Sequence, residues 1–426
     1  DRQTARIDNI GPVDQLRDIK KVAVIGSGTM GGGIAMNFAN RKIPVRIVDV
    51  SDEAIQRGMA VVRSNYERSV KKGKMTPEKL ESVMALFQPT LGYEDLSDCD
   101  LIIEAVFENM ALKKEIFEKL DGVAKPGAIL ATNTSTLDVD EIASATGRPE
   151  DVLGLHFFSP ANIMRLLEVV RGKQTSDQVL ATCMKLGKTI GKVAVVSGVC
   201  YGFIGNRMLE GYGREAGFLH LEGASVGQID KAIFDFGFPM GPLTMSDLAG
   251  NDVGAKVRAE CRQQGMLPDD PRYGVIGDKL TELNRFGQKT GAGFYRYEKG
   301  SRAPIPDSQV EALAEQEAAR LNIERRDITD EEIVNRCLLP MINEGAMILE
   351  EGIAQRASDI DVVWVNGYGF PPYRGGPMFY ADQIGLDKVH AQIVEYGERF
   401  GNEHGYWTPS NLLVDLAKSG RKFGDV

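Results

Sequence analysis

The stretch "GLHFFSP", residues 154–160, places His156, one of only four histidines in 426 residues, among apolar neighbours. A second polar side chain, Glu168, lies within the apolar stretch "LLEVV". A carboxylate is costly to bury without a partner, and His156 is the obvious candidate. A carboxylate that accepts one ring N–H fixes the tautomer and stabilises imidazolium. The pair therefore predicts a general base for an alcohol proton, the alternative being a core histidine bonded to backbone.

Two further polar side chains fit the same chemistry. Ser135 ends the stretch "ATNTS" and offers a hydroxyl to a substrate oxygen, although a strand-end turn or a helix cap would also use serine. Asn206 follows "GFIG" and can donate its side-chain amide to a carbonyl oxygen, or it can simply pack within a helix. Together with His156 and Glu168, these residues are predicted to form a catalytic group of four.

A glycine-rich loop, "VAVIGSGTMGGG", contains a G-x-G-x-x-G motif directly after an apolar run. Gly26 would make the tight turn, Gly28 would let a pyrophosphate approach the backbone, and Gly31 would let a helix pack closely on the strand. The helix N-terminus would then face the phosphates with free N–H groups. The predicted contacts of the loop with a dinucleotide are Gly26, Gly28, Thr29, Met30 and Gly31.

Asp49 ends the next apolar run, about 20 residues after the motif, where a carboxylate can bind an adenosine ribose 2′-hydroxyl. A carboxylate there repels a 2′-phosphate, so the sequence favours NAD over NADP. A plain tight turn is the structural alternative. A flavin is the competing cofactor, but nothing after Asp49 indicates a flavin site.

The elements that must position these residues alternate between strands and helices from residue 20 to about residue 198. The predicted strands are "KVAVIG", "VRIVDV", "LIIEAV", "AILATN", "VLGLHF", "LLEVV" and "KVAVV", with helical segments between most of them. This alternation predicts an α/β Rossmann-type domain, a doubly wound parallel sheet with right-handed crossovers. His156 falls near the end of its strand, where such sheets bind ligands.

The rest of the chain is predicted to be helical and repeated. "NRMLEGYGREAGFLHLEG" (206–223) aligns with "NRCLLPMINEGAMILEEG" (335–352), and "IDKAIFDFGFPMGP" is echoed by "IDVVWVNGYGFPPYRGGP". We therefore expect two all-helical copies that bury a face against each other, as the halves of a dimer would. The predicted organisation is a linker at 1–18, a nucleotide-binding domain at 19–198, helical copies at 199–297 and 327–426, and a connector at 298–326.

Composition excludes several other classes of function. The apolar fraction of 43% and charged fraction of 26% are those of an ordinary globular protein, and the net charge of −10 gives no general attraction to nucleic acid or anionic membranes. No apolar run is long enough to span a membrane, and no cleavable signal opens the chain. Five scattered cysteines without ligand spacing indicate a reducing compartment and no metal site. Because the chain starts at Asp1, we expect it to be part of a longer protein.

The motifs as a set resemble those of the L-3-hydroxyacyl-CoA dehydrogenases of fatty-acid β-oxidation. The matching stretches, in the order found in that family, are "GSGTMGGGIA", "EAVFEN", "NTSTL", "GLHFFSP", "LLEVV" and "GFIGNR". The doubled helical module is similar to the dehydrogenase half of the multifunctional enzymes. In those enzymes an enoyl-CoA hydratase domain usually comes first, and it is absent from this sequence.

The resemblance implies NAD as cofactor and a (3S)-3-hydroxyacyl-CoA or 3-oxoacyl-CoA as substrate. It implies that His156 is the catalytic base and Glu168 its partner, and that Ser135 and Asn206 bind substrate. Further residues expected along the NAD site are Asp49, Glu108, Lys113, Ser135 and Ser159. Glu108 and Lys113 could instead be an ordinary solvated pair near a helix start.

Two positions depart from the single-purpose members of the family. Ser159 stands where those enzymes carry asparagine, as is common in multifunctional members. Asn65 and Lys72 stand at the positions that lie near the CoA phosphates in those enzymes. The basic stretch "RSVKKGK" contains Lys72 and follows Asn65, although surface lysines are usually just solvated. Asn335 aligns with Asn206 but has no second nucleotide fold beside it. The second copy is therefore expected to be structural, in a monomer with an internal pseudo-dimer.

Two other readings stay open. The first is another β-hydroxyacid dehydrogenase, of the hydroxyisobutyrate or phosphogluconate type. Enzymes of those types resemble each other in using a lysine as the base, so the His156–Glu168 pair disfavours this alternative. A non-catalytic NAD-binding scaffold would have no need of the four polar residues together. The expected compartment is a bacterial cytoplasm, with a peroxisome as the alternative, although the final "RKFGDV" lacks the S-K-L address.

Overall fold

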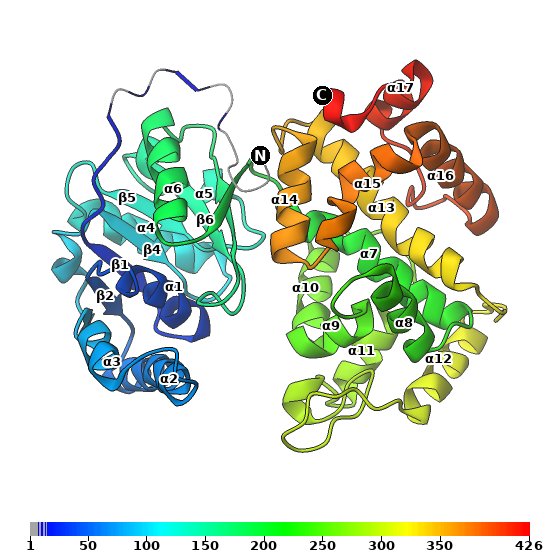
Figure 1. The fold of residues 1–426 in the computed structure, drawn as a ribbon, viewed down its shortest axis with the longest axis horizontal. Helices are drawn as coiled ribbons and strands as arrows, with labels where there is room; N and C mark the ends of the chain where they lie inside the picture. Colours follow the sequence, from blue (N-terminus) through cyan, green and yellow to red (C-terminus); the bar gives the residue numbers. More distant parts are fainter. Residues whose placement is uncertain (1–6, 8–9, 12, 14) are drawn as a thin grey trace. The chain divides into compact units, whose positions relative to one another are not determined.

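The computed structural model describes residues 7, 10, 11, 13 and 15–426 (Figure 1). Much of the predicted linker at 1–18 lies outside the described residues. The chain forms two compact units, one containing Asp1–Asn206 with Glu351–Tyr368, and the other Arg207–Glu350 with Gly369–Val426. Among the described residues, no helix is both long enough and apolar enough to cross a membrane.

An eight-stranded sheet forms the centre of the first unit, in the order β3-β2-β1-β4-β5-β6-β7-β8. Every strand predicted from the sequence forms, and the Rossmann-type fold is confirmed. The strands are β1 (Val22–Ile25), β2 (Val45–Val48), β3 (Phe87–Thr90), β4 (Leu101–Glu104), β5 (Ile129–Thr132), β6 (Val152–Phe157), β7 (Leu166–Val170) and β8 (Val193–Ser197).

One strand departs from the expected parallel arrangement. β7 runs antiparallel to β6, while every other neighbouring pair is parallel. The segment 158–165 that joins them is too short for a helical crossover, which needs about a dozen residues or more, so the chain turns back directly. The turn places His156 opposite Glu168 in register.

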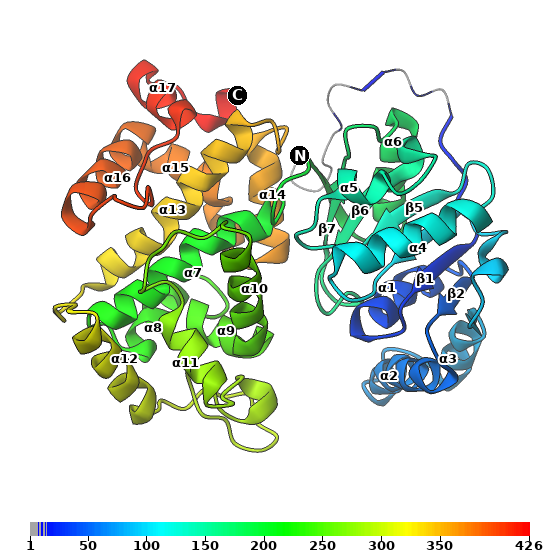
Figure 2. The same ribbon diagram turned by 180° about the vertical axis from the view of Figure 1, so that it is seen from behind.

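Helices cover both faces of the sheet because successive strand side chains point to opposite sides (Figures 1 and 2). Val22 and Val24 pack into one core, and Ala23 and Ile25 pack into the other. The first core includes side chains from α1 (Thr29–Ala39), α2 (Asp52–Lys71), α3 (Pro77–Met84) and α6 (Asp177–Thr189). The second includes side chains from α4 (Met110–Val123) and α5 (Val139–Ala143).

A segment of the second helical copy also belongs to the first unit. Helix α14 (Ala357–Gly367) packs against β7 and β8 at the edge of the sheet. Gly198, just after β8, donates its N–H to the carbonyl of Ile353 at 2.8 Å. Residues far apart in sequence are thereby placed beside the two strands that follow His156.

The second unit is helical, as predicted. Helix α7 (Gly205–Glu222) starts at the boundary between the units, and the predicted connector contains a single helix, α12. The other helices are α8 (Val226–Phe236), α9 (Pro242–Ala249), α10 (Asn251–Gln263), α11 (Val275–Glu282), α12 (Ser308–Arg320), α13 (Asp330–Glu350), α15 (Pro377–Ile384), α16 (Leu386–Phe400) and α17 (Asn411–Ser419).

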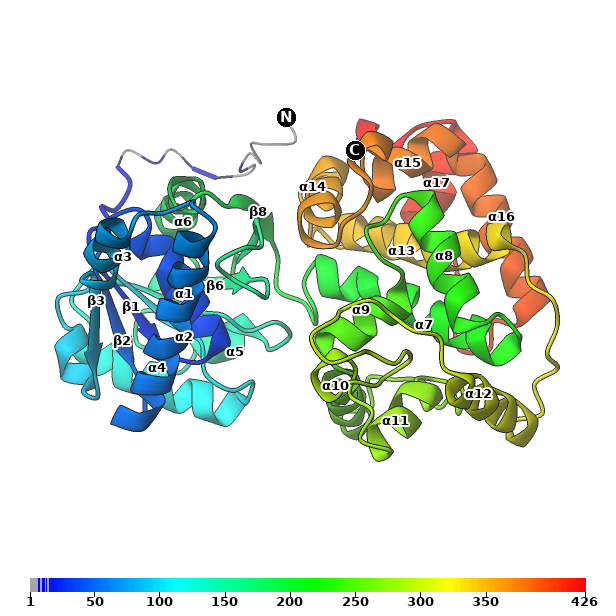
Figure 3. The ribbon, with the colours of Figure 1, turned by 60° about the horizontal axis from the view of Figure 1, so that its bottom comes forward.

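Figure 3 shows the repeated helices α7 and α13 near each other within the second unit. Reciprocal ion pairs join them. Arg207 of the first copy binds Glu344 of the second, with 2.6 Å between Nε and Oε1. Their aligned counterparts exchange roles, since Arg336 of the second copy donates to Glu215 of the first at 2.9 Å. Such an exchange is the signature of a two-fold axis between the copies.

The "GFP" stretches of the two copies repeat this reciprocity. A side chain on Gly237 would lie 2.9 Å from Pro371, and one on the aligned Gly369 would lie 2.8 Å from the aligned Pro239. The aligned Phe238 and Phe370 meet each other, with their ring centroids 5.3 Å apart. The helical copies are therefore packed as the halves of a dimer within one chain.

Candidate active site

The His156–Glu168 pair forms as the sequence predicts. Nδ1 of His156 lies 2.7 Å from Oε2 of Glu168, and only 5% of His156 and none of Glu168 is exposed. The antiparallel register of β6 and β7 sets this contact, because it places the two residues directly opposite each other. Since Glu168 binds Nδ1, the other ring nitrogen, Nε2, is the atom that can exchange a proton with a substrate.

The start of α7 holds the second oxygen of Glu168. The Gly205 N–H donates to Oε1 of Glu168 at 3.0 Å, so the N-terminus of this helix faces the carboxylate. The partial positive charge of a helix N-terminus stabilises a buried negative charge. Asn206, the next residue of α7, is thereby placed beside the His156–Glu168 pair.

Aromatic rings enclose the imidazole of His156. The Phe158 ring centroid lies 4.3 Å away and that of Phe203 lies 5.6 Å away. Phe203 has a φ of +51°, in the left-handed region, which costs a residue with a side chain about 1–2 kcal/mol. The backbone strain is thus located where it turns a fully buried ring toward His156.

Ser135 follows β5, the strand beside β6. Its N–H donates to Glu108 at 2.8 Å and its hydroxyl lies 3.3 Å from the same carboxylate oxygen. The side chain of Asn133 accepts the N–H of Phe157 at 2.9 Å and so ties the ends of β5 and β6 together. Ser135 and His156 therefore lie at neighbouring strand ends, as predicted.

Glu108 and Lys113 do not form an ordinary solvated pair. The Lys113 ammonium is fully buried and lies 2.8 Å from Glu104 and 3.3 Å from Glu108. Burial raises the pKa of Glu108, but the charge of Lys113 and hydrogen bonds from Thr134 and Ser135 outweigh it, so the pKa lies below its usual value. The group acts as an ionic support beneath the loop that carries Ser135.

Glu104 was missed in the sequence, although the signal was present. It ends the apolar strand β4, as Glu168 lies within apolar β7, and it is fully buried. Its carboxylate accepts hydrogen bonds from Lys113, from the N–H of Val106 and from the hydroxyl of Thr132. Like Glu168, Glu104 is an acid in an apolar strand, and a buried acid of this kind needs a partner.

The glycine loop has the geometry that the motif predicts. Gly26 has a φ of +97°, and a side chain there would lie 2.7 Å from the carbonyl of Ala105. A side chain on Gly31 would collide with the backbone of Gly26, so helix and strand can pack closely only around glycine. A side chain on Gly28 would meet nothing within 4 Å, and no side chain caps the helix there. The space above Gly28 and the uncapped N–H groups fit a pyrophosphate.

Asp49, at the end of β2, is joined to this loop. Its carboxylate accepts the N–H and the hydroxyl of Ser27 at 2.7 and 2.5 Å, and the N–H of Val50 at 2.7 Å. Burial would raise the pKa of Asp49, but these hydrogen bonds outweigh it and hold the pKa below its usual value. Thr29 and Met30 open α1 directly beyond the loop.

The segment after β6 carries the exposed Ser159, which precedes a cis proline. Two side chains that the sequence analysis missed anchor this segment. The buried Lys192 donates to the carbonyls of Ala161 and Met164, both at 2.6 Å, and Asn37 also donates to Ala161. Burial lowers the pKa of Lys192 to about 8.

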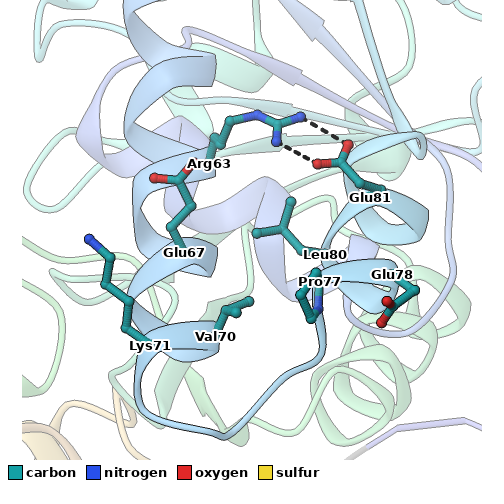
Figure 4. A pocket seen from close by; sticks show the side chains of 8 residues that line it. All are labelled: Arg63, Glu67, Val70, Lys71, Pro77, Glu78, Leu80 and Glu81. Atoms are coloured by element: carbon teal, nitrogen blue, oxygen red, sulfur yellow. Dashed lines mark hydrogen bonds and ion pairs between the residues drawn. The ribbon is translucent and has the colours of Figure 1, made fainter.

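The predicted CoA-phosphate contacts lie on α2 and at its end, in the first unit. Lys72 is exposed at the end of α2, and Asn65 accepts a hydrogen bond from Arg68. A hollow of about 490 Å³ lies between α2 and α3, but Lys72 does not line it (Figure 4). Arg63 spans the hollow to Glu81 at 2.7 Å, and acids outnumber bases in its lining. This hollow is therefore a poor phosphate site.

One more side chain reaches the site from the second helical copy. The hydroxyl of Tyr368, just after α14, donates to the side-chain oxygen of Asn206 at 2.7 Å. Its ring lies edge-on against Phe158, with 5.6 Å between centroids. The contact joins residues 162 positions apart, and nothing in the sequence indicates it.

Comparison with known families identifies this arrangement. Residues 21–200 match the NAD-binding domain of 3-hydroxyacyl-CoA dehydrogenase, and residues 202–297 and 333–424 match its C-terminal domain. This chain belongs to the 3-hydroxyacyl-CoA dehydrogenase family. The match confirms NAD as the cofactor, and two separate stretches match the C-terminal domain, as the repeat predicts.

Relatives within the family include multifunctional enzymes. The peroxisomal bifunctional enzyme of Danio rerio is 46% identical over 414 residues, which are 95% of this chain and 57% of that protein. The fatty acid oxidation complex subunit alpha of Pseudomonas putida is 38% identical over 411 residues, 95% of this chain and 56% of that protein. The chain therefore spans a little over half the length of these relatives.

Solved structures show the same fold. The dehydrogenase part of multifunctional enzyme 1 from C. elegans has a TM-score of 0.70 and 34% identity, over 97% of this chain and 93% of that one. The 3-hydroxybutyryl-CoA dehydrogenase of Escherichia coli has a TM-score of 0.82 and 27% identity, over 95% of this chain and 99% of that one. Both resemblances extend through the helical repeat.

Proposed function

We propose that this chain catalyses the reversible, NAD-dependent oxidation of a (3S)-3-hydroxyacyl-CoA to the 3-oxoacyl-CoA in fatty-acid β-oxidation. The observation that carries the proposal is the buried 2.7 Å contact between His156 and Glu168, on the same sheet as the strand β1 that leads into the glycine loop. NAD⁺, when bound, accepts the hydride from the substrate carbon. The chain must then remove the hydroxyl proton and stabilise the oxygen.

Four side chains divide this work. His156 takes the hydroxyl proton at Nε2, and Glu168 stabilises the resulting imidazolium through Nδ1. The Ser135 hydroxyl and the Asn206 amide bind the substrate oxygen and align it with His156. The rings of Phe158 and Phe203 keep water away from the imidazole, so that each of these polar contacts acts in a medium of low dielectric constant.

The same proposal gives the cofactor contacts. The turn from Gly26 to Gly31, with Thr29 and Met30, binds the pyrophosphate, and Asp49 binds the adenosine ribose. Because Lys113 is fully buried, it serves the cofactor through Glu108, which it holds beneath the Ser135 loop. Ser159, in the exposed segment after β6, is a further contact to the cofactor. Lys72 is the proposed contact to the CoA phosphates.

The proposed function is tested by NADH oxidation on mixing the protein with acetoacetyl-CoA and, separately, with a long-chain 3-oxoacyl-CoA. Rapid oxidation with either substrate supports the dehydrogenase, and the ratio of the two rates begins to define the preferred acyl length. Binding of NADH without turnover of either substrate would contradict the proposal and favour a non-catalytic NAD-binding module.

The wider context is proposed from the relatives. We propose that this chain is the dehydrogenase part of a multifunctional enzyme that also carries an enoyl-CoA hydratase domain, and that it acts as a monomer with an internal pseudo-dimer. The expected bacterial cytoplasm has support from relatives at 38% identity, whereas those at 42–46% are peroxisomal. These identities favour the peroxisome, the alternative compartment.

A further inference from the structure

We propose that Tyr368, supplied by the second helical copy, is a positioning residue that sets the side-chain amide of Asn206 for the substrate oxygen. This inference rests on the proposed function, because Asn206 has work to do only if the site binds an oxygen-bearing substrate. The second copy would then contribute directly to the site rather than serve only as a structural partner.

In the hydrogen bond between the two side chains, Tyr368 is the donor and Asn206 is the acceptor. The Tyr368 hydroxyl donates to Oδ1 of Asn206 at 2.7 Å, so that oxygen is occupied. Fixing Oδ1 also fixes Nδ2, the amide nitrogen, which is left to donate to the substrate oxygen. Without the hydroxyl, the amide could turn and present its oxygen to the substrate, and two acceptors would then face each other.

The tyrosine remains a hydrogen-bond donor at all physiological pH values. Burial and the negative charge of Glu168 raise the pKa of the Tyr368 hydroxyl well above its usual value. The phenol is therefore neutral, and the bond to Asn206 does not depend on a titration near pH 7. This sense of donation is the one that leaves Nδ2 of Asn206 free.

The packing around Tyr368 is built to hold its ring in place. The Tyr368 ring lies edge-on against that of Phe158, which in turn packs against His156. The Tyr368 ring also packs against that of Trp364, with 4.7 Å between centroids. A side chain on Gly205 would lie 2.3 Å from the Tyr368 ring and 2.5 Å from its hydroxyl oxygen. The glycine of "GFIGNR" therefore makes room for this tyrosine.

The internal repeat supplies an independent observation. The stretch "YGFP" of the second copy, residues 368–371, aligns with "FGFP" of the first, residues 236–239. Tyr368 thus corresponds to Phe236, whose ring is buried between those of Phe370 and Tyr380. The hydroxyl is present only in the copy whose ring reaches the His156–Glu168 site, as expected if it serves catalysis rather than packing.

The test is Tyr368→Phe, which removes only the hydroxyl and installs the residue of the first copy. We expect kcat/KM for acetoacetyl-CoA to fall roughly 5- to 50-fold, with the Kd for NADH unchanged and the Tm lowered by no more than a few degrees. The matched control is Tyr66→Phe, because Tyr66 also donates to an asparagine oxygen, that of Asn40, at 3.0 Å. This control should leave kcat/KM unchanged.

A double-mutant cycle with Asn206→Ala distinguishes positioning from a merely structural role. If Tyr368 acts through Asn206, Tyr368→Phe should change kcat/KM by less than about twofold in the Asn206→Ala background. Additive losses, or full activity of Tyr368→Phe alone, would overturn the role of Tyr368 while the dehydrogenase stands. A wild-type protein that turns over no 3-oxoacyl-CoA would instead overturn the proposed function and this role with it.

Discussion

At the scale of single residues, the site depends on carboxylates whose oxygens all have partners. Glu168 divides its oxygens between the imidazole of His156 and the N–H of Gly205. Asp49 divides its oxygens between Ser27 and Val50. A carboxylate held in this way is fixed in orientation as well as charge, and we propose that this lets Asp49 distinguish the ribose of NAD from that of NADP.

Replacing Asp49 with serine tests the predicted cofactor preference. Loss of the carboxylate removes a charge-assisted hydrogen bond to the ribose and also the repulsion of a 2′-phosphate, so the preference for NADH over NADPH should fall about 10- to 100-fold. Fluorescence titration with each cofactor measures the two Kd values. An unchanged ratio would place the ribose elsewhere.

The pH dependence at Asp49 follows from the direction of its pKa shift. Because the pKa in the folded protein lies below its usual value of 3.8, the stabilisation from the ionised carboxylate is complete above that value and is lost as pH falls through the folded pKa. The carboxylate stays ionised at pH 5. Protonation of Asp49 should therefore cause no loss of NADH affinity between pH 7 and pH 5.

The sequence was most informative where one polar residue interrupts an apolar strand. His156 and Glu168 could be predicted because burial requires each of them to have a partner, and the same reasoning applies to Glu104. Tyr368 could not be predicted, because its partner Asn206 is 162 positions away and only the folded chain brings them together. Lys192 likewise contacts backbone carbonyls, which leave no signal in the sequence.

At the scale of elements, helix α4 anchors the loop after β5 through the buried ammonium of Lys113, which binds two carboxylates. Lys113 lies on α4, Glu104 at the end of β4 and Glu108 just before the helix. Removing one partner of such a group leaves uncompensated buried charge, which costs more than the ion pair itself contributes. The stability of this part of the sheet should therefore depend on Lys113.

Substituting Lys113 with methionine should lower the free energy of unfolding by about 3–5 kcal/mol, as measured by urea denaturation. The matched control is Lys119→Met on the same helix, because its ion pair with Glu115 is exposed. That change should leave the free energy of unfolding nearly unchanged, because solvent screens an exposed ion pair. Equal effects of the two substitutions would show that burial does not set the strength of the Lys113 contact.

The loss of stability caused by Lys113→Met should also depend on pH. Lys113 helps to hold the pKa of Glu108 below its usual value of 4.5, so the stability from ionised Glu108 is present above that value and is lost as pH falls through the folded pKa. In Lys113→Met, burial raises the pKa of Glu108, which then takes up a proton at higher pH. The difference in free energy of unfolding between the wild type and Lys113→Met should be largest at pH 7 and smaller at pH 5.

The element that the sequence missed is β3. Its residues, "FQPT", include a proline and two exposed side chains, Gln88 and Pro89, so they lack the apolar run that marks the interior strands. A proline is tolerated there because β3 is at the edge of the sheet, where one side of the strand needs no partner. The antiparallel direction of β7 was also missed, since it depends on the short connection and not on the strand itself.

At the scale of the whole molecule, the two helical copies are not interchangeable. Gly211 and the aligned Pro340 face each other, and a side chain on Gly211 would lie 2.9 Å from Pro340. Two first copies would place glycine against glycine, and two second copies would place proline against proline. The contact as it stands pairs unlike residues of unlike copies, and a single chain provides one of each copy.

We therefore expect the chain to be a monomer in solution, because each copy already covers the dimer face of the other. Sedimentation equilibrium at micromolar concentration should give the mass of one chain, 46.6 kDa. A tight dimer of twice that mass would mean that a different surface makes the assembly, and that the internal pairing does not replace a partner subunit.

If His156 transfers the proton while the glycine loop holds NAD, a change at His156 should affect turnover and leave cofactor binding intact. His156→Gln should lower kcat for acetoacetyl-CoA reduction by about 10²- to 10⁴-fold while the Kd for NADH stays unchanged. His390→Gln, the same change on α16, should leave both values at the wild-type level. Full activity of His156→Gln, or loss of NADH binding with it, would contradict the account.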